Sequence, residues 1–375
     1  MVKIVEAVTS AQMRAFARYP LELYKDCDYY VPCFTSDEKN IKNPKKNYAA
    51  EGCEVKCFLA EKNGRIVGRI AGVIVAESNR KFGEKKIRFS RFDFNGDEDV
   101  AEALLNKVAE FGKERGMTVI HGPWGFNDTD REGMLTSGFD RPATYATNYN
   151  YEYYSDVVRK LGFKKESEWV EFAIYPGTLD PKIYKAADFV QKRYGFVELN
   201  DKYPIKRIIR EYGDLFFDCY NEAYKDLDCY VELKGKVKQN VITQFATVIN
   251  QDYFSCILDP KTGKIAAFGV VIPAIGKIIK KHNGNLLASA IPLLKAKKKP
   301  DALELTLIGV APEYRNSGVN AMIITRIHRN IMKNGIKNVV CNPMLTTNAG
   351  ILTQWKWVEH EEIKRRATFE KEISQ

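Results

Sequence analysis

The stretch that decides the fold reads LELTLIGVAPEYRNSGVNA and spans residues 303–321. Its apolar first part is typical of a β-strand that ends at Val310, and a helix is expected to begin at Gly318. The first N–H groups of a helix have no partner within the helix, so a strand, a short loop and a helix N-terminus can together hold a phosphate. Arg315 in the loop adds a cation that can bind phosphate through two parallel hydrogen bonds. The stretch therefore predicts a site for a diphosphate.

The composition indicates an ordinary globular protein. The chain has 375 residues, enough for two domains, of which 45% are hydrophobic and 28% charged. No apolar run approaches the roughly 20 residues of a membrane span, and no apolar segment of a secretory signal is visible near the N-terminus. The eight cysteines form no C-x-x-C pair and only four histidines are present, so no metal site is expected. Scattered free cysteines fit a reducing compartment, which predicts a cytoplasmic location.

The two halves of the chain repeat one order of expected elements. Each begins with a β-hairpin, at residues 57–75 around Asn63-Gly64 and at residues 254–274 around Thr262-Gly263. A strand, a helix and a strand follow, at residues 87–94, 97–115 and 117–121 in the first half and at 303–310, 318–334 and 336–342 in the second. A further helix is expected in each half, at residues 151–161 and 349–357.

Three segments depart from the shared plan. Residues 175–181 are rich in Pro and Gly and are the expected link, which gives domains at residues 1–178 and 179–375. Residues 122–150 lack regular periodicity, and a polar loop of that length inside a domain is usually functional or mobile. The second half also carries an insertion at residues 276–300, which makes it the longer copy.

The insertion holds much of the positive charge. The net charge is +10, and the runs KIIKK at 277–281 and KAKKK at 295–299 both lie in this segment. A solvated basic face explains such runs, and so does attraction of a polyanionic cofactor, an anionic membrane surface or nucleic acid. The insertion also pairs apolar with cationic residues, as a helix lying in a membrane interface does. No zinc finger, RNP or helix-turn-helix signature is visible, so nucleic acid is not the expected partner.

The loop and its context resemble the GNAT superfamily of acyl-CoA-dependent N-acyltransferases. The family's pattern is V-x-P-x-x-[RQ]-x-x-G-x-[GA], and Val310, Pro312, Arg315 and Gly318 match it, whereas Asn320 stands where Gly or Ala is usual. The resemblance implies an α/β fold of two tandem domains, each with a mixed, mostly antiparallel sheet flanked by helices, as in bacterial GNAT-family acetyltransferases of tandem build. The first half lacks the loop, and the carboxylates of its segment 92–100 would repel a diphosphate.

The resemblance also implies an activity and a cofactor. A GNAT protein moves the acyl group of acetyl-CoA or another acyl-CoA to an amine, here an unidentified small molecule or peptide. The residues that would hold the cofactor are Ile308, Gly309, Val310, Arg315, Asn316, Ser317, Gly318, Val319, Asn320, Asn348 and Trp355. A backbone N–H near 308–310 would polarise the acyl carbonyl. Trp355 occupies the position of the family's acid tyrosine, and an indole cannot release a proton near neutral pH.

The catalytic candidates are Glu304 and His121, each as a general base. The sequence favours a plainer interpretation of both, namely a solvated carboxylate where a strand starts and a hydrogen-bonding histidine where a strand ends. Cys341 is a conceivable nucleophile, but with no histidine nearby in the sequence a buried apolar thiol is the favoured interpretation.

The long loop offers the candidates for acceptor binding. They are Asp130, Arg141, Asn148 and Asn150, accompanied by Asp128 and Arg131. The alternative is a surface loop that satisfies its own polar groups. Tyrosines 149, 151, 153 and 154 are expected to pack in the core. Two other functions stay open, a non-catalytic binding module that retains the GNAT scaffold and a protein that binds a membrane surface or nucleic acid through the insertion.

Overall fold

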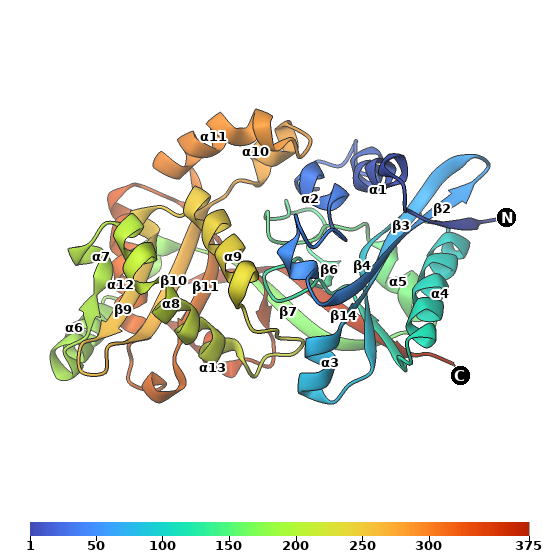
Figure 1. Ribbon diagram of the computed structural model, residues 1–375. Helices are drawn as coiled ribbons and strands as arrows, with labels where there is room; N and C mark the ends of the chain where they lie inside the picture. Colours follow the sequence, from blue (N-terminus) through green and yellow to red (C-terminus); the bar gives the residue numbers. More distant parts are fainter. Residues whose placement is uncertain (375) are drawn as a thin grey trace.

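One continuous mixed sheet runs through the molecule in the computed structural model, which describes residues 1–374 (Figure 1). Its strands follow the order β1 (Lys3–Glu6), β2 (Cys53–Lys62), β3 (Arg65–Val75), β4 (Lys86–Phe94), β5 (Val119–Gly122), β14 (His360–Glu372), β7 (Lys164–Ile174), β12 (Asn338–Cys341), β11 (Ala302–Val310), β10 (Lys264–Pro273), β9 (Phe254–Asp259) and β8 (Val197–Glu198). The short strands β6 (Met134–Ser137) and β13 (Met344–Leu345) pair with β14 and β7. Among the described strands, β4 with β5 and β11 with β12 are parallel and the other pairs antiparallel, so the sheet is mixed and mostly antiparallel, as the resemblance implied.

The first half builds a core on each face of its sheet. The β2–β3 hairpin turns at Asn63-Gly64, where both residues have a positive φ of 53° and 72°, as the sequence predicted. The long helix α4 (Glu98–Glu114) buries an apolar face against one side of the sheet, and α1 (Ser10–Leu23) covers the other side. Shorter helices complete this half, namely α2 (Thr35–Lys39), α3 (Ala76–Phe82) and α5 (Tyr153–Lys160).

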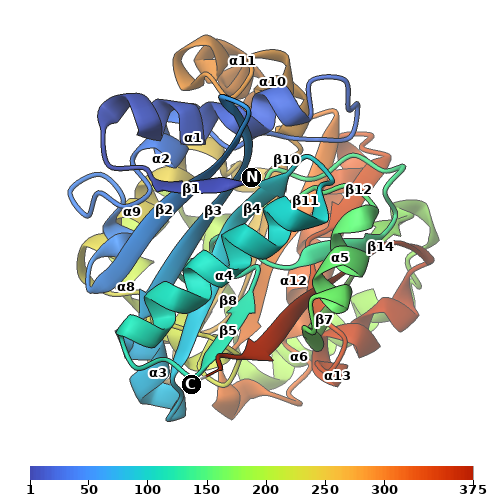
Figure 2. The same cartoon turned by 90° about the vertical axis from the view of Figure 1, so that its right-hand side faces the viewer.

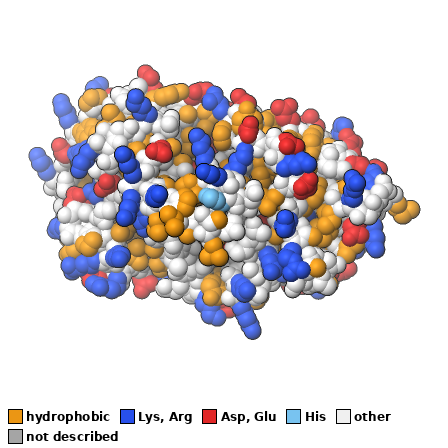
Figure 3. Space-filling view, turned by 90° about the horizontal axis from the view of Figure 1, so that it is seen from above, with side chains coloured by type: hydrophobic (Ala, Val, Ile, Leu, Met, Phe, Trp, Pro, Cys, Tyr) orange, Lys and Arg blue, Asp and Glu red, His pale blue; other side chains and the backbone are white. Residues whose placement is uncertain are grey.

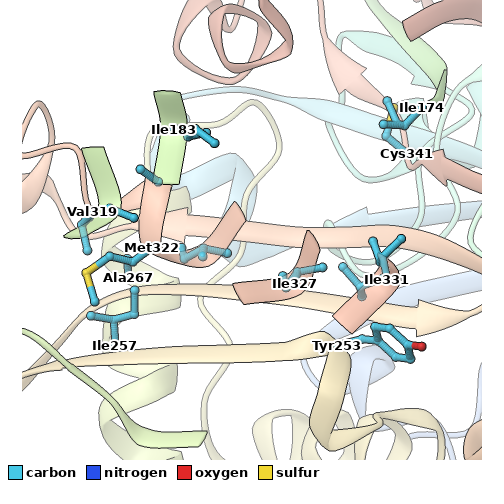
Figure 4. Close-up of a cluster of buried hydrophobic side chains, with 14 of the residues drawn as sticks. Ile174, Ile183, Tyr253, Ile257, Ala267, Val319, Met322, Ile327, Ile331 and Cys341 are labelled. Atoms are coloured by element: carbon cyan, nitrogen blue, oxygen red, sulfur yellow. The ribbon is translucent and has the colours of Figure 1, made fainter. Parts of the chain in front are cut away.

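The second half repeats this arrangement. Helices α6 (Lys182–Tyr194) and α12 (Asn320–Lys333) enclose one core with the sheet, and Figure 4 shows Ile327 and Ile331 of α12 among its side chains. Helices α8 (Ile205–Tyr224) and α9 (Gly235–Val248) cover the opposite face. The remaining helices are α7 (Leu199–Lys202), α10 (Gly276–Lys281), α11 (Leu286–Lys298) and α13 (Ala349–Leu352).

The halves exchange their last strands. Strand β7, from the first half, pairs with β12 of the second half, while β14, from the second half, pairs with β5 of the first. The two exchanged strands also pair with each other from His360↔Ile174 to Glu370↔Lys164. Figure 2 shows β14 lying beside β5 and the C-terminus emerging at the first half. The sheet is therefore continuous because each half supplies an inner strand to the other.

Three local predictions need correction. Helix α12 begins at Asn320 rather than at Gly318, because Gly318 has a left-handed φ of +82° that a regular helix does not contain. The expected helix at 349–357 is a four-residue α-helix followed by the 3-10 turn η5 (Thr353–Trp357). Residues 122–150 are not wholly irregular, since β6 lies within them and pairs with β14.

Candidate functional site

A gap opens in the sheet where β11 and β12 diverge. The parallel pairing of these strands ends at Leu305↔Cys341, and the rest of β11 pairs with β10 alone. A β-bulge at Thr306 marks the point of divergence. The amide of Ala311 donates to Ala266 of the β10 side at 3.0 Å, so alternation along the strand turns the N–H groups of Ile308 and Val310 toward the gap. Two backbone donors thus face a space between strands.

The loop after β11 presents further donors. It passes through the 3-10 turn η4 (Pro312–Tyr314) and reaches left-handed conformations at Asn316 (φ 69°) and Gly318. Within residues 1–374 the amides of Asn316, Gly318 and Asn320 donate no hydrogen bond. Arg315 is exposed and makes one long contact, 3.3 Å from Nη2 to the carbonyl of Ala223. Free amides, a helix N-terminus and a guanidinium are together suited to a diphosphate.

The corresponding gap of the first half is closed. Parallel pairing of β4 and β5 ends at Arg88↔His121, yet the amide of Trp124 then donates to the carbonyl of Phe89 at 2.9 Å. The Arg88 guanidinium donates to the carbonyls of Gly125 and Phe126, and the Tyr154 hydroxyl accepts from the amide of Phe94 at 3.0 Å. Loop and aromatic side chains therefore occupy the space that is open in the second half.

Two tyrosines of α8 connect the open gap with the long loop. Tyr224 donates from Oη to the carbonyl of Ile308 at 3.1 Å, so its hydroxyl lies at the edge of the gap. Tyr220 stacks on Tyr224 with ring centroids 4.6 Å apart and donates to Oδ2 of Asp128. Sequence reasoning missed both tyrosines, although their i, i+4 spacing in a helix would have placed them on one face.

The Asp128 carboxylate, which accepts a hydrogen bond from Tyr220, has one oxygen without a hydrogen-bond partner in the described part of the chain. This oxygen, Oδ1, is buried. Burial raises the pKa of Asp128 to about 6, and the hydrogen bond from Tyr220 limits the rise. The carboxyl is thus largely ionised at neutral pH while one oxygen is free to accept a proton.

Glu304 is buried, and the expectation of a solvated carboxylate is wrong. Its side chain is 2% exposed, and Oε2 lacks a partner among the described residues. Burial raises its pKa to about 8, against the opposing effects of Lys364 and the amide of Tyr145. The physical reason is the long loop of the first half, which covers this end of β11 at Tyr145.

An ion cluster beside Glu304 joins the exchanged strands. Glu171 of β7 is fully buried, with Arg366 Nη2 at 2.7 Å and Lys364 Nζ at 3.4 Å, both from β14. Burial alone would raise the pKa of Glu171, but Arg366 and Lys364 lower it. Removing one partner from such a cluster leaves a buried charge uncompensated.

The four loop residues proposed for acceptor binding also brace the protein. Asp130 binds Arg91 through both oxygens, and Arg141 lies 3.4 Å from Glu361. The Asn148 amide donates to Gly133, and Asn150 both accepts from and donates to Leu135. Contact of any of these residues with a substrate stays a prediction.

The remaining candidates lie within packed surroundings. His121 is buried with Nδ1 3.1 Å from Glu166, and burial lowers its pKa, so its role as a base stays a prediction. The Trp355 indole donates to the sulfur of Met344 at 3.1 Å, and Asn348 caps α13. Cys341 is a buried thiol, which is the interpretation that the sequence favoured, and burial raises its pKa to about 12.

The tyrosines at 149, 151, 153 and 154 pack as predicted. Tyr149 and Tyr154 are buried, and neighbouring rings along the segment meet edge to face or stack. The cluster forms core rather than an open binding wall.

Comparison with known proteins agrees with this architecture. The chain is 23% identical over 373 residues to Protein YghO of Escherichia coli K12, covering 96% of this chain and 93% of that protein. It is 24% identical over 330 residues to the bacterial ceramide synthase of Caulobacter vibrioides, covering 86% and 84%. A solved tandem GNAT protein from the clavulanic acid biosynthesis pathway superposes with a TM-score of 0.60 at 10% identity, covering 100% of this chain and 99% of that one. No family model matches the chain.

The fold is therefore the tandem GNAT fold, as the resemblance implied. Within residues 1–374, the helices are all too short or too polar to cross a membrane.

Proposed function

We propose that the protein is an acyl-CoA-dependent N-acyltransferase whose cofactor binds in the second half. The observation that carries the proposal is the open gap between β11 and β12 leading to a loop of free amides and Arg315. A diphosphate fits these donors, and the gap has N–H groups at Ile308 and Val310 along its edge. The fold supports this class of activity, because GNAT proteins use acyl-CoA donors.

The chain's own residues can be assigned parts in the reaction. Bound acyl-CoA would supply a thioester carbonyl, the group that an amine attacks. Arg315 and the amides near Gly318 would hold the diphosphate, and the N–H groups of Ile308 and Val310 would stabilise negative charge on a carbonyl oxygen. Tyr224 keeps its proton at neutral pH, because burial raises its pKa, and so keeps its hydrogen bond to the Ile308 carbonyl at the edge of the gap.

Two carboxyl groups compete for the part of general base. A base must be ionised before it accepts a proton, and Asp128, with a pKa of about 6, meets this condition at pH 7. Glu304, with a pKa of about 8, is mostly protonated there. Glu304 also lies four residues before Ile308 on β11, which places the two residues roughly 13 Å apart along an extended strand. Asp128 is therefore the proposed base, acting at Oδ1.

A titration with acetyl-CoA tests the binding part of the proposal. The wild type is expected to bind, whereas Arg315→Ala is expected to bind about 10- to 100-fold more weakly, since a charged hydrogen bond contributes about 1.5–3 kcal/mol. Lys333→Ala, at the far end of α12, is the matched control for loss of one positive charge. Absence of binding by the wild type at high micromolar cofactor would show that the gap is not a CoA site.

The pH dependence of kcat/KM tests the base. Turnover is followed as free CoA thiol with a panel of amines, including an amino sugar, a polyamine, a peptide and a long-chain amino alcohol. The last is included because a relative is named a bacterial ceramide synthase. The wild-type kcat/KM is expected to rise as the pH increases through about 6. Asp128→Asn should lower kcat/KM about 10²- to 10⁴-fold and remove its rise with pH. Glu304→Gln should leave the rise in place.

Two results would change the assignment. A rise near pH 8 that is lost in Glu304→Gln would make Glu304 the base instead of Asp128. Binding of acyl-CoA without thiol release on any amine would favour the non-catalytic module.

A further inference from the structure

Helices α10 and α11 form a layer on one face of the molecule, as Figure 1 shows at the top. Their inner side packs on the rest of the protein, because Ile279 and Leu293 lie in a cluster with Phe34, Tyr145 and Val248. Lys297 also points inward, donating from Nζ to the carbonyl of Ala246 at 2.6 Å. The layer is thus fixed to the body of the protein by one side only.

The outer side of α11 is apolar and uncovered. Leu287, Ile291 and Leu294 follow one another at i, i+4 and i+7, so they lie on one face of the helix, with Leu286 next to its start. They are exposed by 87%, 68% and 58%, and Leu286 by 46%. We call these four residues the α11 stripe. Single exposed leucines are ordinary, but a row at helical spacing usually marks a surface that another body covers.

Positive charge surrounds the α11 stripe. Residues 276–300 contain seven lysines and no Asp or Glu. Those exposed are Lys277, Lys281, Lys295, Lys298 and Lys299. Figure 3 looks down on this side of the molecule and shows hydrophobic side chains interspersed with Lys and Arg.

We propose that the α11 stripe docks the protein on the surface of an anionic lipid bilayer. Aliphatic side chains would enter the interface while the lysines meet lipid phosphates, the arrangement of helices that lie in a membrane surface. A second copy of the chain fits less well, because two such faces would bring lysines against lysines. Nucleic acid also fits less well, because residues 276–300 contain no Phe, Tyr or Trp on which a base could stack.

Vesicle co-sedimentation tests the proposal without any need for turnover. The full chain is expected to bind vesicles of phosphatidylcholine that contain about one third phosphatidylglycerol, and to bind pure phosphatidylcholine much more weakly. Replacing Lys295, Lys298 and Lys299 together by Gln should weaken binding roughly 100-fold, at about fivefold per lysine. Replacing Leu287, Ile291 and Leu294 together by Gln should weaken it at least tenfold.

Matched controls come from α6. Phe189 is a 60% exposed hydrophobic residue there, so Phe189→Gln changes apolar exposure elsewhere. Lys185, Lys192 and Arg193, all exposed and replaced together by Gln, remove the same three positive charges elsewhere. Both variants should bind vesicles like the wild type. Thermal unfolding of every variant reports whether it folds, and Leu287→Gln alone, at the most exposed position, serves if the triple variant does not.

Three outcomes would overturn the proposal. The first is a wild type that does not sediment with anionic vesicles. The second is binding that neither the lysine nor the stripe variants reduce. The third is a dimer in sedimentation velocity without lipid that the stripe substitutions abolish, which would show that a second copy covers the stripe.

Discussion

Substituting Glu304 by Gln isolates the effect of one buried carboxyl on stability. Glutamine keeps the shape of the protonated carboxyl but does not titrate. Burial raises the pKa of Glu304 from 4.5 to about 8, so the folded protein holds a proton that the unfolded chain releases above pH 4.5. The contribution of protonated Glu304 to the free energy of unfolding is thus fully present below pH 4.5 and is lost as the pH rises toward 8.

The structure gives the size of this loss. Each pH unit between the unfolded and folded pKa values removes about 1.4 kcal/mol from the free energy of unfolding. Between pH 5 and pH 8 the wild type should therefore lose about 3–4 kcal/mol through Glu304, and Glu304→Gln should not. The two proteins share every other titrating group, including Asp128, so the contributions of groups that do not interact with Glu304 cancel in the comparison.

Urea-induced unfolding at the two pH values, followed by tryptophan fluorescence, measures the effect. The advantage of Glu304→Gln over the wild type should grow by about 3–4 kcal/mol from pH 5 to pH 8. Glu359→Gln, at an exposed carboxyl, is the control and should show no such growth. If the difference between wild type and Glu304→Gln is the same at both pH values, Glu304 is not held protonated and the argument from burial fails.

Three further predictions concern the loop, a cysteine and the exchanged strand. Gly318→Ala should lower the free energy of unfolding by about 1–2 kcal/mol, because the backbone there has a φ of +82° that side chains with a Cβ disfavour. Gly318→Val should lower it further, because a Cβ at this position already lies 3.1 Å from Val190 and valine adds two methyl groups. Equal thermal stability of wild type and both variants would contradict this. Cys341, with a pKa of about 12, should resist iodoacetamide at pH 8 until urea is added, and mass spectrometry showing prompt labelling of the native protein would refute its burial. Deleting the chain from His360 onward should raise hydrogen exchange at β5 in the other half, whereas unchanged protection there would contradict the pairing of β14 with β5.

Local patterns in the sequence predicted the elements that short-range forces decide. The hairpin turn at Asn63-Gly64 requires left-handed backbone, and the spacing of apolar residues in α4 and α12 places them on one face. The loop after β11 stood out for the same reason, since its backbone donors and Arg315 lie within a few residues of one another; that it binds a diphosphate stays a prediction. These features need no knowledge of the rest of the chain.

Contacts between distant segments explain what the sequence did not predict. Glu304 is buried because a loop of the other half covers it near Tyr145, and nothing around Glu304 in the sequence indicates that cover. Tyr220 and Tyr224 acquire their place at the gap from the packing of α8 on β11, which helical spacing alone does not specify. The exchange of β7 and β14 depends on pairing between segments far apart in the chain, which local patterns do not specify.

The exchange of last strands gives this single chain the form of a strand-swapped dimer with its two subunits fused. In a dimer of identical chains, both subunits must carry the same loop, and assembly depends on protein concentration. Fusion removes both conditions. The two copies can therefore differ: one carries the loop with Arg315, while the other fills its gap at Trp124 and Tyr154 and supplies the loop that covers Glu304. Two positions that would be equivalent in a dimer of identical chains therefore differ here: β11 and β12 diverge in the second half, and the corresponding place in the first half is filled.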